Sequence, residues 1–319
     1  MRLITTYLFL LFLNTFTVAQ QTAQYTQFTF NKYGYNPAAA GTNINAKLEL
    51  ICGIRNQWVG FDHAPTSNFM SANYTFKPKR SYKRWHNAGV YLSNDNAGIF
   101  QNFSIYGSYT LHLPLSKKMN MSFGVFGGVR RFSVANTFFS PGDPVNTVTS
   151  ASVWTYPDII PGFRLYSKKF FFDVSVQQLY KNRQAQGDKQ IGNKSVLTPH
   201  LYISYGKYFK LENGFVLVPA INLHSSLTNI PSMEVNFMAY YRKTVGIGAT
   251  VRGKNFISAI LQLRIFKTST VGFAYDYSIN QMNAVSPNTF EIIFGLTPLL
   301  FAEGEKTIDT GARCPTFDF

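Results

Sequence analysis

Side chains of alternating polarity recur along most of this chain, and that period of two limits the fold more than any other feature. In the stretch 233–242, Met233, Val235 and Phe237 are apolar, whereas the intervening Glu234 and Asn236 are polar. Successive side chains of a β-strand point to opposite faces, so this stretch predicts a strand with one apolar and one polar face. The same alternation marks residues 47–55, 245–252 and 271–278.

The composition indicates that the apolar faces meet lipid. Charged residues make up 14% of the 319 residues and aromatic residues 16%, whereas soluble domains carry about 25% charged residues. No segment after residue 20 is a continuous apolar run of the roughly 20 residues that a membrane helix needs. A transmembrane β-barrel places alternating apolar side chains toward lipid and the small or polar ones inside.

The alternating runs predict an all-β fold, a transmembrane antiparallel β-barrel of about fourteen strands. An even number lets the first and last strands pair, which removes the open edges that lipid cannot satisfy. A soluble β-sandwich or propeller would also alternate, but it would need more charge on its exposed face. The predicted strands are 47–57, 67–76, 86–94, 100–112, 119–132, 153–166, 169–181, 196–209, 213–225, 232–243, 244–252, 255–266, 269–281 and 288–297.

The N-terminus has the pattern of a Sec signal peptide. Arg2 precedes the mainly apolar residues 3–16, and Thr17 and Ala19 are small residues before an expected cleavage at Gln20. A transmembrane anchor is the alternative, but the apolar stretch is short. We therefore expect residues 1–19 to be removed on Sec export and the mature chain to reach the outer membrane.

The cysteine and metal-binding patterns are sparse. The two cysteines are Cys52, on the predicted apolar face of a strand, and Cys314, near the C-terminus. An exported protein could form a disulfide, but these positions do not favour one. The sequence contains neither a CxxC nor an HExxH motif, so we expect no metal or other cofactor.

The connections between the predicted strands indicate the orientation of the barrel. If the N-terminus lies in the periplasm, the mostly short even-to-odd connections are periplasmic. The two longest connections, 133–152 and 182–195, are then extracellular, as is usual for outer-membrane barrels. Basic residues crowd the periplasmic set, above all in residues 77–84.

The segment before the first strand is predicted to be a plug. Residues 20–45 lack clean alternation, and Asn36-Pro37 interrupts pairing because proline cannot donate to a strand ladder. We expect this segment to fold into or across the periplasmic mouth. The barrel is then predicted over 46–298, followed by a periplasmic C-terminal tail over 299–319.

The polar faces of the strands predict ion pairs inside the lumen. Arg55 needs a carboxylate partner there, because an unpaired buried charge is costly. Glu49 lies six residues away on the same strand, about 20 Å at 3.3 Å per residue, so the partner should come from another strand or from the plug. A water-filled pore lined by independent charges is the alternative. The predicted lumen residues are Glu49, Arg55, Gln57, Asp173, Glu234, Arg252, Arg264 and Asp276.

Several sequence pieces, taken in order, resemble the PorP/SprF family of outer-membrane proteins, which serve the type IX secretion and gliding machinery of Bacteroidota. The pieces are QYTQFTFNKYGYNPAAAG from residue 24, RNQWVGF from residue 55 followed by APTS, GVYLSNDNAGIF, SIYGSY and a terminal RCPTF. They span nearly the whole mature chain. One departure is Lys32-Tyr33-Gly34, where such proteins tend to have Asn-Pro after the phenylalanine.

The resemblance implies a non-catalytic role in protein secretion or gliding motility. The implied partners, besides outer-membrane lipids, are a periplasmic lipoprotein or secretion-system ring component, or a secreted surface adhesin. Basic turns could instead only meet anionic headgroups. We expect the partner-binding residues on the periplasmic rim and tail to be Lys77, Lys79, Arg80, Lys83, Arg84, Arg313, Cys314, Pro315, Phe317 and Phe319.

Three other functions are alternatives to this one. A fatty-acid-channel-like transporter of hydrophobic small molecules is the main alternative, because NPAAAG at 36–41 also resembles the lumenal hatch of such barrels. An enzyme is disfavoured, since no Gly-x-Ser-x-Gly is present and the five histidines are isolated. Nucleic-acid binding, which a net charge of +15 could suggest, does not suit an exported barrel.

Overall fold

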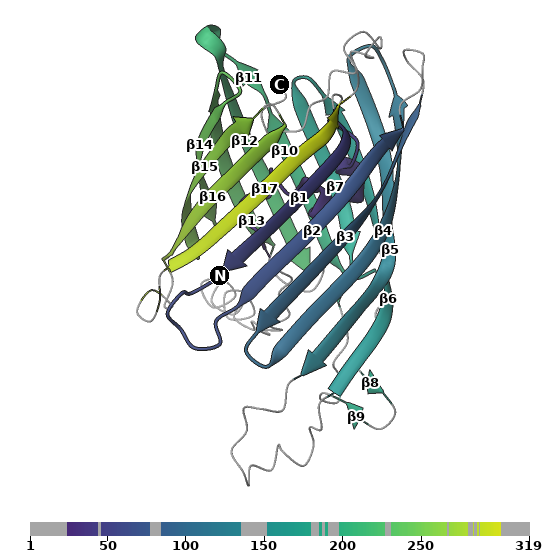
Figure 1. Cartoon of the computed structure of the whole chain (residues 1–319), viewed down its shortest axis with the longest axis vertical. Coiled ribbons are helices and arrows are strands. Elements are labelled where there is room, and N and C mark those ends of the chain that lie inside the picture. Colours follow the sequence, from purple (N-terminus) through teal and green to yellow (C-terminus); the bar gives the residue numbers. More distant parts are fainter. Residues whose placement is uncertain are drawn as a thin grey trace, which may run out of the picture.

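Fourteen antiparallel strands form a closed barrel in this computed structural model (Figure 1). The structure describes residues 24–43, 46–76, 84–134, 152–179, 185–186, 189–190, 198–226, 231–266, 268–279, 283, 286 and 288–300. The ring closes where β1 pairs with β17 and where β10 pairs with β12. Its strands are β1 (Ala46–Asn56), β2 (Thr66–Phe76), β3 (Trp85–Ala97), β4 (Phe100–Pro114), β5 (Met119–Val134), β6 (Ser152–Ser167), β7 (Phe170–Gln177), β10 (His200–Lys207), β12 (Phe215–Ser226), β13 (Ser232–Tyr241), β14 (Val245–Arg252), β15 (Phe256–Phe266), β16 (Ser269–Ser278) and β17 (Asn288–Leu300).

The prediction of a closed barrel of fourteen strands is confirmed, and the differences lie at strand ends. β7 and β10 are shorter than predicted, whereas β17 runs to Leu300, two residues past the predicted end of the barrel at 298. A short strand, β11 (Phe209–Lys210), pairs with β12 outside the ring, beside the 3₁₀ helix η3 (Glu212–Gly214). A separate two-residue pairing joins β8 (Ala185–Gln186) to β9 (Lys189–Gln190).

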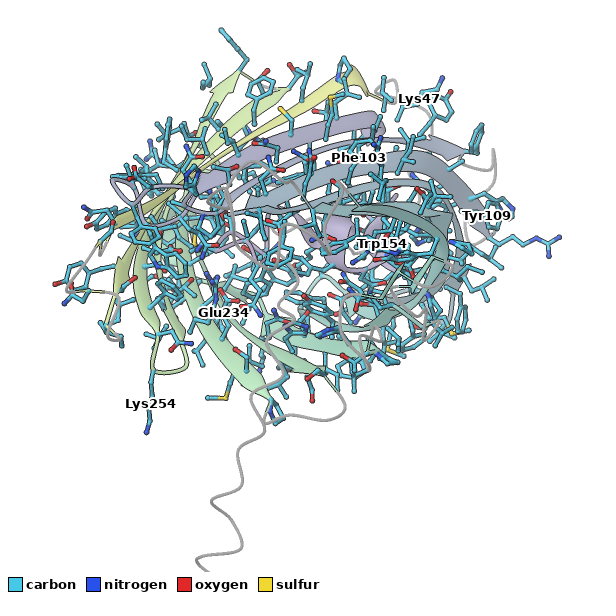
Figure 2. All side chains as sticks on the ribbon, turned by 90° about the horizontal axis from the view of Figure 1, so that it is seen from below. Lys47, Phe103, Tyr109, Trp154, Glu234 and Lys254 are labelled. Carbon is cyan, nitrogen blue, oxygen red and sulfur yellow. The ribbon has the colours of Figure 1, made fainter. Side chains whose placement is uncertain are left out.

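Alternation sorts the side chains of each strand between the outside and the lumen. On β13 and β14, Phe237 is 48% exposed and Ile247 59% exposed, whereas Asn236 and Thr250 are buried. Figure 2 looks along the barrel and shows Glu234 inside the ring, with Lys254 projecting from it. Large apolar side chains are exposed on every wall strand except β6 and β7, where the large outward apolar side chains are half-buried, and this surface suits lipid contact. In the described part of the chain, no helix has both the length and the apolar character to cross a membrane.

The two ends of the barrel differ in their connections. We call the end at which β1 begins the start end, and the opposite end the loop end. The start end carries the short turns 115–118, 168–169 and 242–244. The loop end carries the two longest connections, 135–151 and 178–199, so the predicted separation of short turns from long loops holds.

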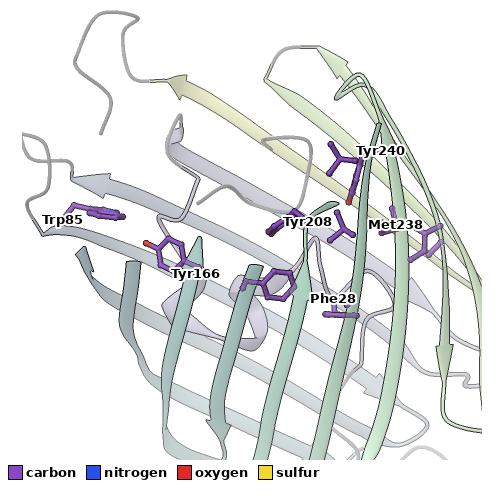
Figure 3. Close-up of a cluster of buried hydrophobic side chains, with 12 residues drawn as sticks. Phe28, Trp85, Tyr166, Tyr208, Met238 and Tyr240 are labelled. Atoms are coloured by element: carbon purple, nitrogen blue, oxygen red, sulfur yellow. The ribbon is translucent and has the colours of Figure 1, made fainter. Parts of the chain in front are cut away.

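The lumen is filled by aromatic and aliphatic side chains from the wall and from the segment before β1. Residues 24–43, which we call the plug, contain only a one-turn helix α2 (Lys32–Tyr35) and a 3₁₀ turn η1 (Pro37–Ala39), and no wall strand. Phe28 of the plug belongs to a buried cluster with Trp85, Tyr166 and Met238 (Figure 3). The barrel interior is thus a packed core that surrounds a non-strand segment.

Candidate functional site

The plug crosses the lumen from near the loop end to near the start end. Gln24 Nε2 lies 2.7 Å from His224 Nδ1, close to the loop end of β12. Asn36 Nδ2 donates to Asp173 Oδ1 at 3.1 Å, in the middle of β7. Trp85 Nε1, at the first residue of β3, donates to the Gly41 carbonyl at 3.2 Å. The sequence predicted a plug at one mouth of the barrel. In the structure the polar partners of the plug are spread along the wall, so the plug runs through the lumen.

The wall satisfies the backbone of the NPAAAG stretch. A plug without regular structure exposes carbonyl groups that need donors when buried. The carbonyl oxygens of Pro37, Ala38 and Ala40 accept from Thr110, Ser122 and His112, at 2.8, 2.7 and 2.8 Å respectively. A carbonyl can only accept, so His112 Nε2 carries the hydrogen and its Nδ1 accepts from the Tyr166 hydroxyl at 2.6 Å.

Small residues on both sides let this stretch touch the wall. A Cβ added at Gly124 of β5 would overlap the backbone of Ala38, and one at Gly162 of β6 would overlap the Asn36 side chain. Gly41 has a φ of +71°, a left-handed conformation that favours glycine. Glycines of the wall therefore make room for Ala38 and Asn36 of the plug, and Gly41 lets the plug backbone approach Asn87 and His112.

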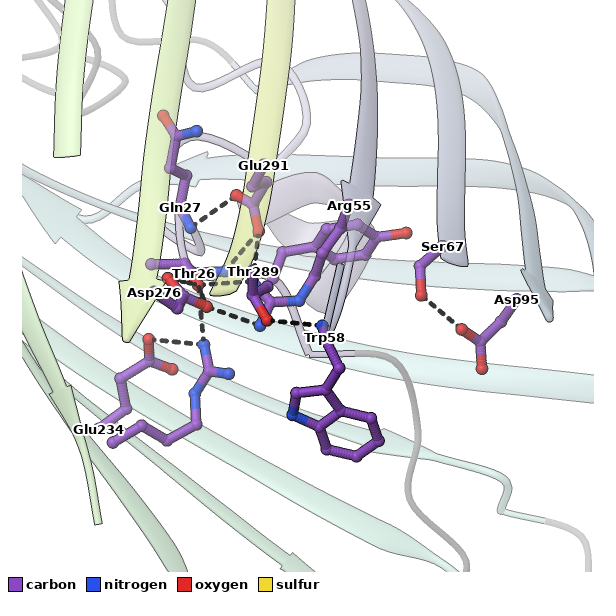
Figure 4. Close-up of polar contacts among 12 residues, drawn as sticks. Thr26, Gln27, Arg55, Trp58, Ser67, Asp95, Glu234, Asp276, Thr289 and Glu291 are labelled. Carbon is purple, nitrogen blue, oxygen red and sulfur yellow. Dashed lines mark hydrogen bonds and ion pairs between the residues drawn. The ribbon is translucent and has the colours of Figure 1, made fainter. Parts of the chain in front are cut away.

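Five buried charged residues form an arginine–carboxylate cluster near the loop end (Figure 4). The Arg55 guanidinium lies 2.6 Å from Asp276 and 3.2 Å from Glu291, and Arg252 lies 3.2 Å from Glu234. The members come from β1, β13, β14, β16 and β17, so the cluster ties together non-adjacent parts of the chain.

The plug completes this cluster through Thr26. The backbone N–H groups of Thr26 and Gln27 donate to the two oxygens of Glu291 at 2.7 and 2.9 Å. The Thr26 hydroxyl donates to Asp276 at 2.6 Å and accepts from Arg55 at 2.7 Å. Hydrogen bonds that satisfy each member are what make buried charges tolerable, so the plug and the cluster depend on each other.

A second ionic site holds the middle of the plug. Arg164 donates to both oxygens of Asp173 at 3.1 Å, and Lys32 Nζ lies 3.9 Å from the same carboxylate. The Lys32 ammonium also sits 2.7 Å from the centroid of the Phe171 ring, a cation–π contact. Asp173 therefore links β6 and β7 to α2.

Two plug tyrosines close a loop at the N-terminal part of the plug. The Tyr25 backbone N–H donates to the Tyr35 hydroxyl at 2.6 Å, and that hydroxyl donates to the Tyr25 carbonyl at 3.4 Å. Burial raises the pKa of both tyrosines well above the usual value, so both remain neutral hydrogen-bonding groups.

The structure brings some predicted lumen residues together and separates others. Arg55, Glu234, Arg252 and Asp276 share one cluster, whereas Asp173 belongs to the second site. Glu49 is half-buried and accepts from Asn73 at 3.2 Å. Gln57 lies beyond the end of β1 and Arg264 is half-buried near the start end.

Sequence reasoning missed three charged members of these sites, Glu291, Arg164 and Lys32. Glu291 and Arg164 lie on predicted strands at alternating positions that face inward, so the same period of two could have found them, whereas Lys32 lies in the plug. Thr26 carries no pattern that marks it, because its role comes from the path of the plug. Of the predicted rim and tail residues only Arg84 is described, and it is exposed; the others lie outside the described residues.

In the part of the chain that the structure describes, the remaining histidines and Cys52 form no recognised catalytic or metal-binding arrangement. His200 and His224 contact each other at 3.0 Å, and Cys52 is exposed on the outer face. Within the described ranges, no group of three or more His, Cys, Asp or Glu residues could hold a metal ion.

Two cavities between plug and wall are lined by described residues, and both are small. One, of about 20 Å³, is lined by residues that include Lys32, Asn36 and Asp173. The other, of about 10 Å³, is lined by residues that include Gln24, His224 and Glu234. Each has room for about one water molecule.

The family of this protein follows from a match over most of its length. Residues 17–296 match the family described as type IX secretion system membrane protein PorP/SprF. The chain belongs to the PorP/SprF family. The resemblance seen in its sequence pieces is confirmed, and family and barrel fold together support an outer-membrane location. No curated protein matches this PorP/SprF chain.

Solved structures with a similar fold are outer-membrane barrels. The CymD monoaromatic hydrocarbon channel has a TM-score of 0.52 at 10% identity, covering 84% of this chain and 92% of that one. The Ralstonia pickettii toluene transporter TbuX has a TM-score of 0.51 at 10% identity, covering 83% and 92%. At such low identity these likenesses show the fold alone.

Proposed function

We propose that this PorP/SprF protein is a non-catalytic barrel component of type IX secretion and gliding motility that works by docking other envelope proteins. The partners would be a periplasmic lipoprotein or secretion-system ring component, or a secreted surface adhesin. The observation that carries this proposal is the plug, whose backbone is bonded to the wall along the lumen. A barrel closed in this way is suited to act through its outer surfaces.

The energetics of the plug support a permanent closure. Each buried polar group left without its partner costs about 1–3 kcal/mol. Withdrawing the plug would remove partners from Asp276 and Glu291 at the loop end, from Asp173 in the middle and from His112 near the start end. Free passage through the lumen would therefore require several such losses together.

The proposed docking surface is the start end together with the C-terminal tail. We infer it from the basic stretch 77–84, of which Arg84 is exposed, and from the apolar end of the tail. Charges at a surface steer association, whereas Pro315, Phe317 and Phe319 would supply apolar contacts.

Copurification tests this proposal. One variant ends after Ala312, and another replaces Lys77, Lys79, Arg80, Lys83 and Arg84 with glutamine. Both should insert as heat-resistant barrels, lose the partner protein on copurification, and fail in secretion or gliding. Replacing Lys254 at the loop end with glutamine is the control and should change nothing. Normal copurification and secretion by both test variants would contradict docking at this end.

A hydrocarbon transporter is the second candidate, because CymD and TbuX are described as a channel and a transporter for such molecules. A cavity of roughly 150 Å³ can bind benzene, whereas the two cavities beside the plug measure about 20 and 10 Å³. Transport would thus need the plug to move. Saturable uptake of a monoaromatic compound by cells that make this protein would favour the second candidate.

A further inference from the structure

Two adjacent connections at the start end are joined into one projection, which we call the basic tip. It comprises residues 207–215, which include β11 and η3, and the turn 241–244 (Figure 1, beside the β11 label). The Arg242 N–H donates to the Gly214 carbonyl at 3.0 Å, and the rings of Phe215 and Tyr241 lie 4.7 Å apart. The two connections therefore present one ordered surface.

The outward face of the basic tip is apolar. Phe209, Leu211, Phe215 and Tyr241 are 42%, 54%, 42% and 38% exposed. They continue the exposed outward rows of the wall strands, for example Tyr205 on β10. This continuity with the lipid-facing band favours lipid as the occupant of the apolar face.

Cations border that apolar face. The tip carries Lys207, Lys210, Arg242 and Lys243 against one acidic residue, Glu212. The Lys207 ammonium lies 4.8 Å from the Phe209 ring centroid, and the Arg242 guanidinium lies 5.2 Å from that of Tyr241. These two cations are thus held beside exposed aromatic rings. Such a pairing suits the boundary between the charged headgroups and the apolar acyl chains of lipids.

The turn that holds two of the cations is strained. Arg242 and Lys243 are the central residues of a turn that the Thr244 N–H closes by donating to the Tyr241 carbonyl at 3.0 Å. Their φ values are +46° and +56°, and turns with φ > 0 at both central positions strongly prefer Asn-Gly. At the opposite end of β14, the turn 253–255 uses Gly253 where φ is +51°. Asn-Gly would fit this turn better than Arg242-Lys243. The presence of two cations there therefore suggests that their charges have a function.

We propose that the basic tip is a binding site for an anionic phospholipid. The lipid phosphate contacts the cations of the tip, and its acyl chains lie along Phe209, Leu211 and Phe215. An acidic protein would match the charge, but it would leave this outward apolar row without a partner.

Lipid binding to the purified full-length protein in detergent, followed by native mass spectrometry, tests the site. The protein should bind phosphatidylglycerol in preference to phosphatidylcholine. The variant Arg242→Asn with Lys243→Gly should bind phosphatidylglycerol about 30-fold more weakly, because each cation contributes about 1 kcal/mol at an anionic lipid surface. It should also resist heat at least as well as the unmodified protein, because the new turn relieves strain.

The matched control removes two exposed cations from the loop end, by Arg131→Gln with Lys254→Gln, and should retain binding. Equal loss in the control, or no preference for phosphatidylglycerol, would overturn the proposal. Displacement of phosphatidylglycerol by inorganic phosphate at the same concentration as the lipid would overturn the proposal in favour of a phosphate site. Displacement by a polyglutamate peptide would overturn it in favour of an acidic protein.

Discussion

At the scale of single residues, Arg55 joins the plug to the wall. It contacts Asp276, Glu291 and Thr26 while being 1% exposed. Removing one member of a buried ion pair costs about 3–5 kcal/mol, because the other charge remains buried. Arg55→Ala should therefore lower the temperature at which the folded barrel loses its characteristic gel mobility. Arg131→Ala, at an exposed arginine of β5, is the control. Equal melting of both variants would mean that water replaces the guanidinium.

Gly124 tests the contact between the plug and β5 at one position. A Cβ there would overlap Ala38, and overpacking of this kind costs about 1–3 kcal/mol. Gly124→Ala should destabilise the plugged barrel and make the plug easier to cleave with protease. Gly127→Ala on the same strand meets nothing within 4 Å and should behave like the unmodified protein. A Gly124 variant as resistant as the Gly127 variant would show that the plug shifts without cost.

The residue scale also shows where sequence reasoning succeeds and fails. Alternation correctly gives Arg55, Glu234, Arg252 and Asp276 an inward direction, because the period of two follows from the strand itself. It does not give their partners, since register between strands and the path of the plug are set by tertiary contacts. Thr26 illustrates this limit, because its partners Asp276 and Glu291 are 250 and 265 residues away in the sequence.

At the scale of elements, the plug is the part whose position could not be read from the sequence. The lack of alternation in this segment and its Asn36-Pro37 pair correctly predict a segment that is not a wall strand. Its passage along the lumen depends instead on donors and acceptors spread over several wall strands, from His224 to Trp85. Those wall residues are distant in sequence and carry no common pattern.

Deleting residues 24–43 tests the plug as an element. The deletion should raise single-channel conductance in planar bilayers, because it removes the segment that fills the lumen. It should also lower heat resistance, since Asp276 and Glu291 lose hydrogen bonds from Thr26. Shortening the loop-end connection 178–199 is the control. A deleted barrel that folds but conducts no better would mean that other residues close the lumen.

At the scale of the whole molecule, the strand number and closure could be predicted because each wall strand repeats one local pattern. Because fourteen is an even number, the first and last strands run antiparallel and can pair, as β1 and β17 do. The extra strand β11 and the tip around it could not be predicted, since a two-residue pairing has no periodicity. The fold does not show which end of the barrel faces the cell exterior. The lengths of the connections at the two ends are the basis for predicting that orientation.

We predict that the loop end faces the cell exterior and the start end faces the periplasm. The long connections lie at the loop end and the short turns at the start end, the arrangement usual in outer-membrane barrels. Single cysteines at Lys254 and Lys118, in turns at opposite ends, would be placed in a background with Cys52 and Cys314 replaced by serine. A membrane-impermeant maleimide should label Lys254→Cys on intact cells and Lys118→Cys only after permeabilisation. The reverse pattern would put the basic start end outside the cell, and the docking and lipid-binding proposals would then concern the cell surface.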